Sequence, residues 1–450
     1  MTDFAPARKV RNEPTGEIAM KGKSYIYAGA LTLALATALS LSASITQANT
    51  KHGKKPKVPV IRVDPSWPKM PLPSSDDPRT DPAYLGEVST ATGKPKPWVT
   101  GEVAGTCIDS RDHVFIVTRG NLVAPETVEA VPAPPVIEFN KAGDVVNAWG
   151  DRNVLPNGIH GCFIDYQDNV WIAGNGDGIV QKYSHSGILL LQIGTRGVCD
   201  WPANGNACGN SGGDPTANQS QTLLNQPANM YIDPNKDPVT GERGSIYIAD
   251  GYGNHRVVVF SATGTYLRQW GGVAGTVNNP VTDFPGLFGS GDGGHPHCIT
   301  IGKDGLVYVC DRQNDRIQLF TKTGVLQRVI PVVPGTGQTL GIGGAPGLGT
   351  AGSAWDLAFT KDHEQAYMFE VDGGNEILHT MDRVLGKIVA SLGQPGHQAG
   401  QFTYLHSVVL DSEGNVYTGE TINGRRVQKF TQLECKERRG HGYGKDDCDD

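Results

Sequence analysis

The stretch DGLVYVCDRQNDRIQLF, residues 304–320, decides the fold because its last part recurs along the chain. RIQLF (316–320) has a basic first residue, then alternating apolar positions and an aromatic end. Six copies of such a phrase predict six structural units. The other five, each ending in an aromatic or equivalent residue, are PVIEF (135–139), IVQKY (179–183), RVVVF (256–260), EILHT (376–380) and RVQKF (426–430).

Each copy belongs to a longer unit that reads as four antiparallel strands. A hairpin precedes each copy, as in CITIGKDGLVYVCD (298–311), and a β-rich run follows five of them, as in TGTYLRQWG (263–271). Four strands per unit with a period of roughly 40–60 residues are typical of a propeller, so we predict an all-β, six-bladed β-propeller. The sixth unit lacks its fourth strand, and we expect the N-terminal segment within residues 58–90 to close the ring. The blade phrase resembles the NHL repeat.

The composition agrees with many short strands and argues against nucleic acid as a partner. The 450 residues include 59 Gly and 29 Pro, a richness typical of short strands joined by turns. The formal net charge is −7, so the chain has no overall basic character with which to bind phosphates.

The first fifty residues have the features of an export signal. Lys21 and Lys23 precede an apolar run over 25–41, and small residues follow as far as Ala48, which predicts a signal peptide cleaved after Ala48. Cleavage would leave no stable membrane anchor and a periplasmic or secreted protein; an uncleaved anchor is the alternative. The predicted organisation is an N-terminal extension (1–19), a signal peptide (20–48), a linker (49–83), the propeller (84–432) and a charged tail (433–450).

Export would allow the eight cysteines to form disulfides. Cys199 and Cys208 lie close together in a Gly/Asn-rich loop, and Cys435 and Cys448 flank the charged tail, so both are candidate local pairs. Cys310 is expected to lie beside His297 as a thiol behind the candidate metal site or as a small buried residue, and the second is favoured.

Three histidines occupy the same register in alternate blades. Counting seven residues back from the hairpin turn gives His160, His297 and His406 as the first position of the innermost strand in blades 2, 4 and 6. Innermost strands surround the axis, so these imidazoles would stand about 120° apart in one channel. Three converging histidines predict an open catalytic metal site, with zinc expected and iron or manganese as alternatives; satisfied channel histidines are the structural alternative. The other blades carry Ala104, Ala228 and Trp355 or Asp356 at this position.

Long insertions are expected at the same mouth of the channel. They precede blades 3, 4 and 5 and cover residues 196–225, 272–294 and 331–353. Loops gathered over one mouth form a pocket for a small molecule or a peptide. His295 lies in one of them and is expected to line the mouth rather than bind the metal.

With the histidines placed, the chain resembles peptidyl-α-hydroxyglycine α-amidating lyase, a six-bladed propeller with a three-histidine zinc. The resemblance covers most of residues 100–430. It is most specific in GEVAGTCIDSRDHVFIVTRG (101–120), IADGYGNHRVVVFSATGTYLRQWG (248–271), PHCITIGKDGLVYVCDRQNDRIQLF (296–320) and LHSVVLDSEGNVYTGE (405–420).

The resemblance implies roles for particular residues. The zinc ligands fall on His160, His297 and His406, the active-site arginine on Arg119 and the catalytic tyrosine on Tyr252. The implied reaction breaks the C–N bond of a carbinolamide to give an amide and glyoxylate. Tyr252 would act as the base, and Arg119 would hold the substrate carboxylate. The structural alternatives are an interblade packing residue for Tyr252 and a solvated loop cation for Arg119.

The chain departs from this family at three positions. Ser407 stands where the family has the aspartate that serves a structural calcium, so the resemblance does not support calcium here. Tyr404 replaces a methionine and Gly253 a cysteine. No copper monooxygenase domain accompanies the propeller, so a hydroxylated substrate would come from a separate monooxygenase.

Two other classes of function fit the predicted fold. A propeller lactonase or esterase would bind calcium through carboxylate and amide oxygens, whereas the axial positions here hold histidine and alanine. A non-catalytic NHL module would bind protein or glycan at its open face, which leaves the alternating histidines without a role. The site therefore favours a metal-dependent lyase.

Overall fold

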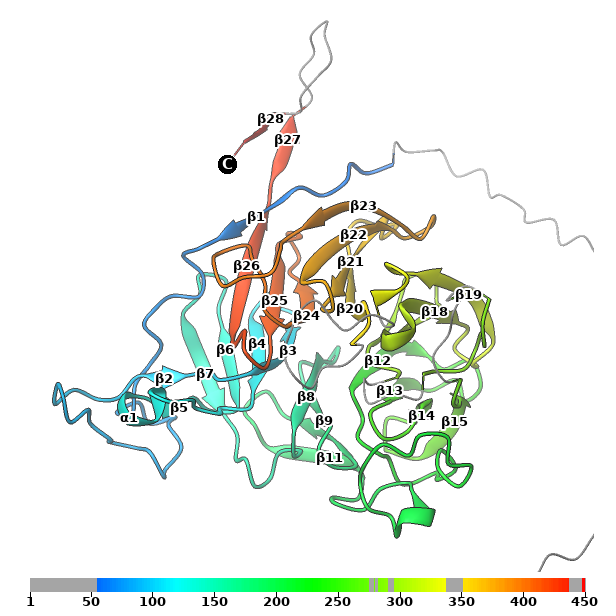
Figure 1. Cartoon of the computed structure of the whole chain (residues 1–450), viewed down its shortest axis with the longest axis horizontal. Helices are drawn as coiled ribbons and strands as arrows, with labels where there is room; N and C mark the ends of the chain where they lie inside the picture. Colours follow the sequence, from blue (N-terminus) through cyan, green and yellow to red (C-terminus); the bar gives the residue numbers. More distant parts are fainter. Residues whose placement is uncertain are drawn as a thin grey trace, which may run out of the picture. The chain divides into compact units, whose positions relative to one another are not determined.

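The computed structural model describes residues 55–274, 279, 282–289, 295–336, 351–436 and 447–449. Within this part, six four-stranded antiparallel sheets form the blades of a propeller (Figure 1), as predicted. Neighbouring innermost strands contact one another in turn around the ring, and the last of them contacts the first. The predicted signal peptide and N-terminal extension lie outside the described residues.

The strands of the first three blades follow the order of the chain from the axis outward. Blade 1 contains β3 (Val103–Ile108), β4 (Val114–Thr118), β6 (Val136–Phe139) and β7 (Val145–Trp149). Blade 2 contains β8 (Ile159–Ile164), β9 (Val170–Gly174), β10 (Ile179–Tyr183) and β11 (Leu189–Gly194). Blade 3 contains β12 (Asn229–Lys236), β13 (Arg243–Asp250), β14 (Arg256–Phe260) and β15 (Tyr266–Gly271).

The last three blades repeat the arrangement, except that the outer strand of blade 6 comes from the N-terminal side. Blade 4 contains β16 (Ile299–Ile301), β17 (Val307–Asp311), β18 (Arg316–Phe320) and β19 (Leu326–Pro331). Blade 5 contains β20 (Ala354–Phe359), β21 (Tyr367–Asp372), β22 (Ile377–Asp382) and β23 (Lys387–Leu392). Blade 6 contains β24 (Leu405–Leu410), β25 (Val416–Glu420), β26 (Arg426–Gln432) and β1 (Ile61–Asp64).

The N-terminal strand closes the ring, as the missing fourth strand of blade 6 predicts. β1 pairs antiparallel with β26, with Ile61 opposite Gln432 and Asp64 opposite Lys429. Ile61 and Val63 pack against a core cluster that includes Phe430. The propeller therefore begins inside the stretch predicted as a linker (49–83).

Val63→Asp is expected to lower the free energy of unfolding by about 1–3 kcal/mol, because it places a charge against the core and weakens the closing strand. Urea unfolding measures this change. Val60→Asp is the matched control, since Val60 precedes the strand and is 42% exposed. Equal destabilisation by the two variants would contradict closure of the ring by β1.

The basic residue that opens the repeated phrase forms a buried ion pair. Nε of Arg316 donates to Asp311 at 2.7 Å, and Nε of Arg256 donates to Asp250 at 3.0 Å. In each pair the carboxylate ends the second strand and the guanidinium begins the third, and all four side chains are at most 1% exposed. The basic residue of the repeated phrase therefore joins the second and third strands at the mouth end of each of these two blades.

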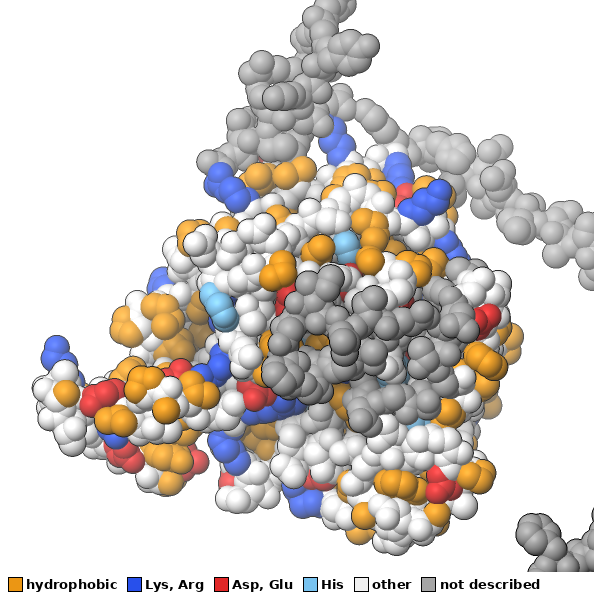
Figure 2. All heavy atoms as spheres, viewed as in Figure 1, with side chains coloured by type: hydrophobic (Ala, Val, Ile, Leu, Met, Phe, Trp, Pro, Cys, Tyr) orange, Lys and Arg blue, Asp and Glu red, His pale blue; other side chains and the backbone are white. Residues whose placement is uncertain are grey.

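A lobe stands beside blade 1 and carries the described helix (Figure 1). It contains a parallel pair formed by β2 (Trp98–Val99) and β5 (Val131–Pro132), and a single turn, α1 (Glu126–Glu129). Hydrophobic side chains gather on it in the space-filling view (Figure 2). Leu85 and Val88, in the segment that precedes β2, are exposed hydrophobic residues. Two 3₁₀ turns, η1 (Pro202–Asn204) and η2 (Arg312–Asn314), and the pair β27 (Glu434–Lys436) and β28 (Asp447–Asp449) complete the described elements.

Three disulfides join described cysteines. Cys199–Cys208 is the predicted local pair, whereas Cys107–Cys162 links the innermost strands of blades 1 and 2. Cys310 is buried, as the favoured interpretation held, but it is not a free thiol, because it is bonded to Cys298 within blade 4. For the remaining predicted pair, the backbone places Cys435 opposite Cys448 in the β27–β28 ladder. Such bonds are typical of oxidising compartments, and no helix in the described ranges has the length and hydropathy needed to span a membrane.

Glu370 is a buried carboxyl in the second strand of blade 5. Its side chain is fully buried, and neither oxygen has a hydrogen-bond partner in the described part of the chain. Burial, with repulsion from Asp372 and Asp356, raises the pKa of Glu370 well above its usual range. The equivalent positions of the other blades hold Ile116, Ile172, Ile248, Val309 and Thr418.

Glu370→Val is expected to stabilise the propeller, and more so at high pH. Because the raised pKa keeps a proton in the folded state that the unfolded chain releases above pH 4.5, the wild-type protein should lose about 1.4 kcal/mol of stability per pH unit from this group. Chemical unfolding between pH 5 and 8 measures the slope, with Glu364→Val on an exposed turn as control. An unchanged slope in Glu370→Val would contradict this account.

Candidate metal centre and active site

Three buried imidazoles meet on the propeller axis. His160 lies on β8, His406 lies on β24, and His297 lies two residues before β16. Their exposed fractions are 2%, 5% and 2%. One ring nitrogen from each lies within 4.8 Å of the others, and the ring centroids are 4.6–5.1 Å apart. The structure thus brings together the residues that the repeat alignment selects.

Carbonyls of the next blade orient two of the three histidines. Nδ1 of His160 lies 2.8 Å from the Ala228 carbonyl, and Nδ1 of His297 lies 2.7 Å from the Trp355 carbonyl. These carbonyls belong to the equivalent positions of blades 3 and 5. His406 stands in the same relation to Ala104 of blade 1, although the geometry there falls outside that of a hydrogen bond. An Nδ1–H donated to a carbonyl leaves Nε2 as a free lone pair for a metal.

The environment of the three imidazoles favours their neutral form. Burial lowers the pKa of His160 and His297 well below the usual value, and lowers that of His406 to about 3. The positive charges of Arg119 and Arg312 act in the same direction on His406. Neutral imidazole is the form that binds metal ions.

Tyr252 places its hydroxyl against two of the histidines. It follows β13, and its oxygen lies 3.0 Å from Nε2 of His160 and 3.1 Å from Nε2 of His297. Ser211, in the insertion 196–225, donates to the carbonyl of the adjacent Gly253 at 2.6 Å. That insertion therefore supports the candidate base, as expected for a loop at this mouth.

Arg312 is a candidate site residue that the sequence reasoning missed. Its guanidinium donates to the Tyr252 hydroxyl at 3.2 Å and stacks 4.3 Å from the Trp355 ring centroid. The residue is 4% exposed, and Nε has no hydrogen-bond partner among the described residues. The signal was its position directly after the second strand of blade 4, which matches that of Arg119 in blade 1.

Arg119 lies close enough to the centre for its charge to lower the pKa of His160 and His406. Its Nε donates to the Ile159 carbonyl at 3.1 Å, and its guanidinium pairs with Glu102. Sequence reasoning did not identify Glu102. Because the side chain of Arg119 is 26% exposed, it remains accessible from the mouth.

His295 does not line the mouth as expected. It is fully buried, and its Nδ1 accepts a hydrogen bond from the Gln313 amide at 3.2 Å. It therefore supports the segment that carries Arg312. Parts of the other two predicted mouth loops, 272–294 and 331–353, lie outside the described residues.

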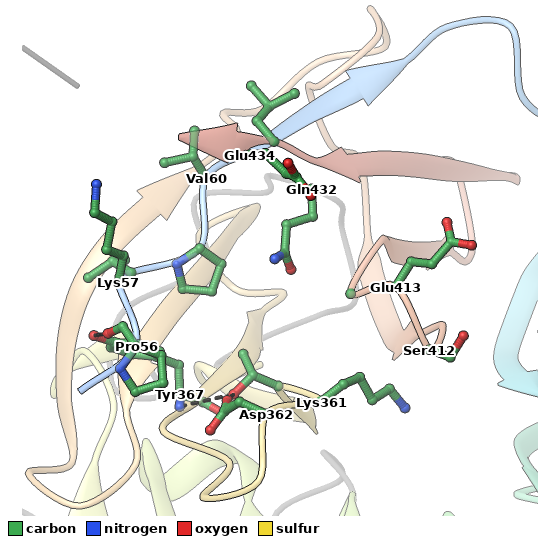
Figure 3. Close-up of a pocket in the computed structure, with 15 residues that line it drawn as sticks. Pro56, Lys57, Val60, Lys361, Asp362, Tyr367, Ser412, Glu413, Gln432 and Glu434 are labelled. Atoms are coloured by element: carbon green, nitrogen blue, oxygen red, sulfur yellow. Dashed lines mark hydrogen bonds between the residues drawn. The ribbon is translucent and has the colours of Figure 1, made fainter. Parts of the chain in front are cut away.

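Two cavities continue along the axis below the histidines. A small cavity of about 20 Å³ is lined by all three and also by Asp356 and Ser407, whose hydroxyl lies 3.1 Å from that of Thr106. A second cavity of about 240 Å³ shares Asp356 and is also lined by Ile108 and Leu410, the last residues of the innermost strands β3 and β24. A larger groove of about 610 Å³, shown in Figure 3, lies apart from this chemistry, between the segment 56–60 and turns of blades 5 and 6.

No protein-family profile matches the chain. Human "NHL repeat-containing protein 3" is 24% identical over 355 residues, which cover 75% of this chain and 81% of the relative. "Peptidyl-glycine alpha-amidating monooxygenase A" of Xenopus laevis is 34% identical over 235 residues, which cover 49% of this chain and 21% of the relative. The "probable peptidyl-alpha-hydroxyglycine alpha-amidating lyase" of Caenorhabditis elegans is 28% identical over 235 residues, which cover 49% of this chain and 56% of the relative.

The chain is homologous to amidating lyases and to NHL repeat-containing proteins. The match spans about a fifth of the Xenopus monooxygenase and about half of the nematode lyase. Among solved structures, a streptogramin B lyase covers 74% of this chain and 94% of its own length, with 12% identity and a TM-score of 0.44. Since both kinds of homologue match at low identity, function has to be argued from the site.

Proposed function

We propose that the chain is an exported, metal-dependent carbon–nitrogen lyase that cleaves a peptidyl- or N-acyl-α-hydroxyglycine to an amide and glyoxylate. The observation that carries this proposal is the convergence of His160, His297 and His406 with the Tyr252 hydroxyl at one point on the axis. Homology to amidating lyases supports the same reaction class. Disulfides in the described core support export.

The residues present fit a zinc ion. Three neutral imidazoles, two of them oriented by carbonyls, with no further His, Cys, Asp or Glu ligand beside them among the described residues, match the open three-histidine sites of zinc enzymes. The same donors would accept iron or manganese. A zinc ion held there would act as a Lewis acid toward the hydroxyl oxygen of the substrate.

The surrounding side chains can carry out the proton transfer and bind the substrate. Tyr252 is placed to take the proton of the substrate hydroxyl and to deliver it to the amide nitrogen as the C–N bond breaks. The reaction is then balanced, because the proton that leaves the substrate hydroxyl ends on the nitrogen of the released amide. Arg312, fixed on the Trp355 ring, and Arg119 at the mouth supply positive charge for the substrate carboxylate. A separate monooxygenase would supply the hydroxylated substrate.

Release of glyoxylate from α-hydroxyhippurate tests the proposal. The purified chain is expected to form glyoxylate and benzamide in equal amounts and to lose this activity on chelation. His363→Ala, an exposed histidine on a blade 5 turn, should behave as the wild type. Hydrolysis of lactones or esters without glyoxylate would indicate another metal-dependent enzyme instead.

Similarity to NHL repeat-containing protein 3 favours a second candidate, a non-catalytic binding module. Metal-loaded protein that is inactive on all of these substrates would favour it.

A further inference from the structure

A second group of metal-binding side chains lies between blades 1 and 2, away from the central histidines. Asp109 and His113 belong to the turn between β3 and β4, Glu138 lies on β6, and His185 lies in the turn between β10 and β11 of blade 2. Asp109 lies five positions after Ala104 of the central site along β3, which is about 17 Å at the rise of a strand. This group therefore lies toward the opposite end of the inner strands.

The carboxylate of Glu138 is held between the two imidazoles. Its Oε1 lies 2.6 Å from Nδ1 of His113, and its Oε2 lies 2.9 Å from Nε2 of His185. One donor atom each from Asp109, His113 and Glu138 lie within 4.8 Å of one another. The carboxylates are buried, with side chains 0% and 3% exposed, and the two histidines are 22% and 32% exposed. A cation can therefore reach the group from solvent.

The other blades carry different residues at these places. In blade 2 the turn residue Asp165 is paired with Asn169 and Lys182. In blade 4 the position of His185 is Lys322, which reaches back to Asp233 of blade 3. In both cases a lysine neutralises one aspartate of the turn. Blade 1 has His113 in place of asparagine and Glu138 in place of lysine, and this exchange adds a second carboxylate and an imidazole at the same point.

Arg111 supplies the balancing charge in this structure. Its NH2 group lies 2.7 Å from Asp109, 3.1 Å from Glu138 and 2.8 Å from Nε2 of His185. That imidazole nitrogen thus faces an N–H donor and a carboxylate acceptor at once. A ring nitrogen offers either a lone pair or a proton, so only one of the two contacts is satisfied. The Arg111 side chain is 54% exposed, so it borders solvent on one side.

We propose that His113, Glu138, His185 and Asp109 form a second, interblade site for a divalent transition metal such as Zn²⁺, which replaces the Arg111 guanidinium. Imidazole and carboxylate together are ligands that zinc accepts in tetrahedral sites. The ion would satisfy the lone pair of His185 and both carboxylates. It would also join blades 1 and 2 on the side where Cys107–Cys162 already links their inner strands. This proposal does not depend on the proposed lyase function.

Zinc content of the purified full chain tests the proposal directly. Protein stripped with chelator, equilibrated with Zn²⁺ and freed of excess ion is measured by elemental mass spectrometry. In a His297→Ala background, one equivalent is expected to remain. Adding His113→Asn and Glu138→Lys, the residues that blade 2 carries at these positions, is expected to remove it. Equal zinc in both proteins would overturn the proposal.

Arg111→Gln provides the second measurement, because it removes the competing guanidinium. We expect it to bind the second equivalent at least 10-fold more tightly and to show a larger rise of the melting temperature with Zn²⁺. If the group were only an ion-pair network, Arg111→Gln would lower the melting temperature and Zn²⁺ would not restore it. Wild-type protein that binds the interblade equivalent but forms no glyoxylate, with or without the central equivalent, would count against the proposed function and not against this site.

Discussion

Tyr252→Phe is expected to slow glyoxylate formation by about 10²–10⁴-fold, the range that a positioned general acid or base contributes. The substitution removes only the hydroxyl oxygen, which lies 3.0–3.1 Å from two histidine nitrogens and 3.2 Å from Arg312. The ring still packs against His160 and His297, so the site should keep its shape. Steady-state kinetics with α-hydroxyhippurate measure the effect.

The metal content separates this role from a structural one. Tyr252→Phe is expected to keep the central metal equivalent, since backbone carbonyls orient His160 and His297, and Tyr252 has no hydrogen bond to His406. Tyr266→Phe, on the outer strand of blade 3, is the matched control and should retain full activity. A Tyr252→Phe variant with wild-type rates would contradict the assignment of Tyr252 as the base.

His406→Ala is expected to remove the central metal and to lower the rate by about 10³-fold or more, because a Lewis acid contributes several kcal/mol and each 1.4 kcal/mol is tenfold in rate. His406 is one of three equivalent donors, and its ring lies 4.6 Å from that of His160. Elemental analysis and the glyoxylate assay measure the two effects on one preparation.

The substitution should leave the propeller folded. His406 lies at a bulge between Leu405 and Ser407, outside the paired register of the strand. Its ring packs against Trp355, so its loss should affect only the packing at the centre. His363→Ala again serves as the control for histidine loss on the surface. Full activity in a metal-free His406→Ala protein would show that the reaction does not use this centre.

The ring and its axial residues could be predicted because a hairpin turn sets the register of each strand. A shift by one residue would move every core side chain to the wrong face, so the alignment that places RIQLF also places His160, His297 and His406. The same alignment pointed to an N-terminal closing strand, which is β1. It could also have revealed Cys107–Cys162, because both cysteines lie on the innermost strands of neighbouring blades.

Other features depend on contacts that the repeat does not encode. Arg312 reaches Tyr252 because η2 turns its side chain over Trp355, and His295 is buried because its loop folds back onto Gln313. The ion pair between Glu102 and Arg119 becomes evident only in the three-dimensional structure. These residues lie between strands, where the position of a residue in the sequence does not determine the direction in which its side chain points.

Anomalous diffraction at the zinc absorption edge, on crystals of the purified chain, tests the central claim most directly. The account predicts a peak on the propeller axis, about 2.0–2.1 Å from Nε2 of His160, His297 and His406, with the Tyr252 hydroxyl displaced from its contacts with the two imidazoles. Zinc-equilibrated crystals without a peak there, with Tyr252 still hydrogen-bonded to His160 and His297, would contradict it.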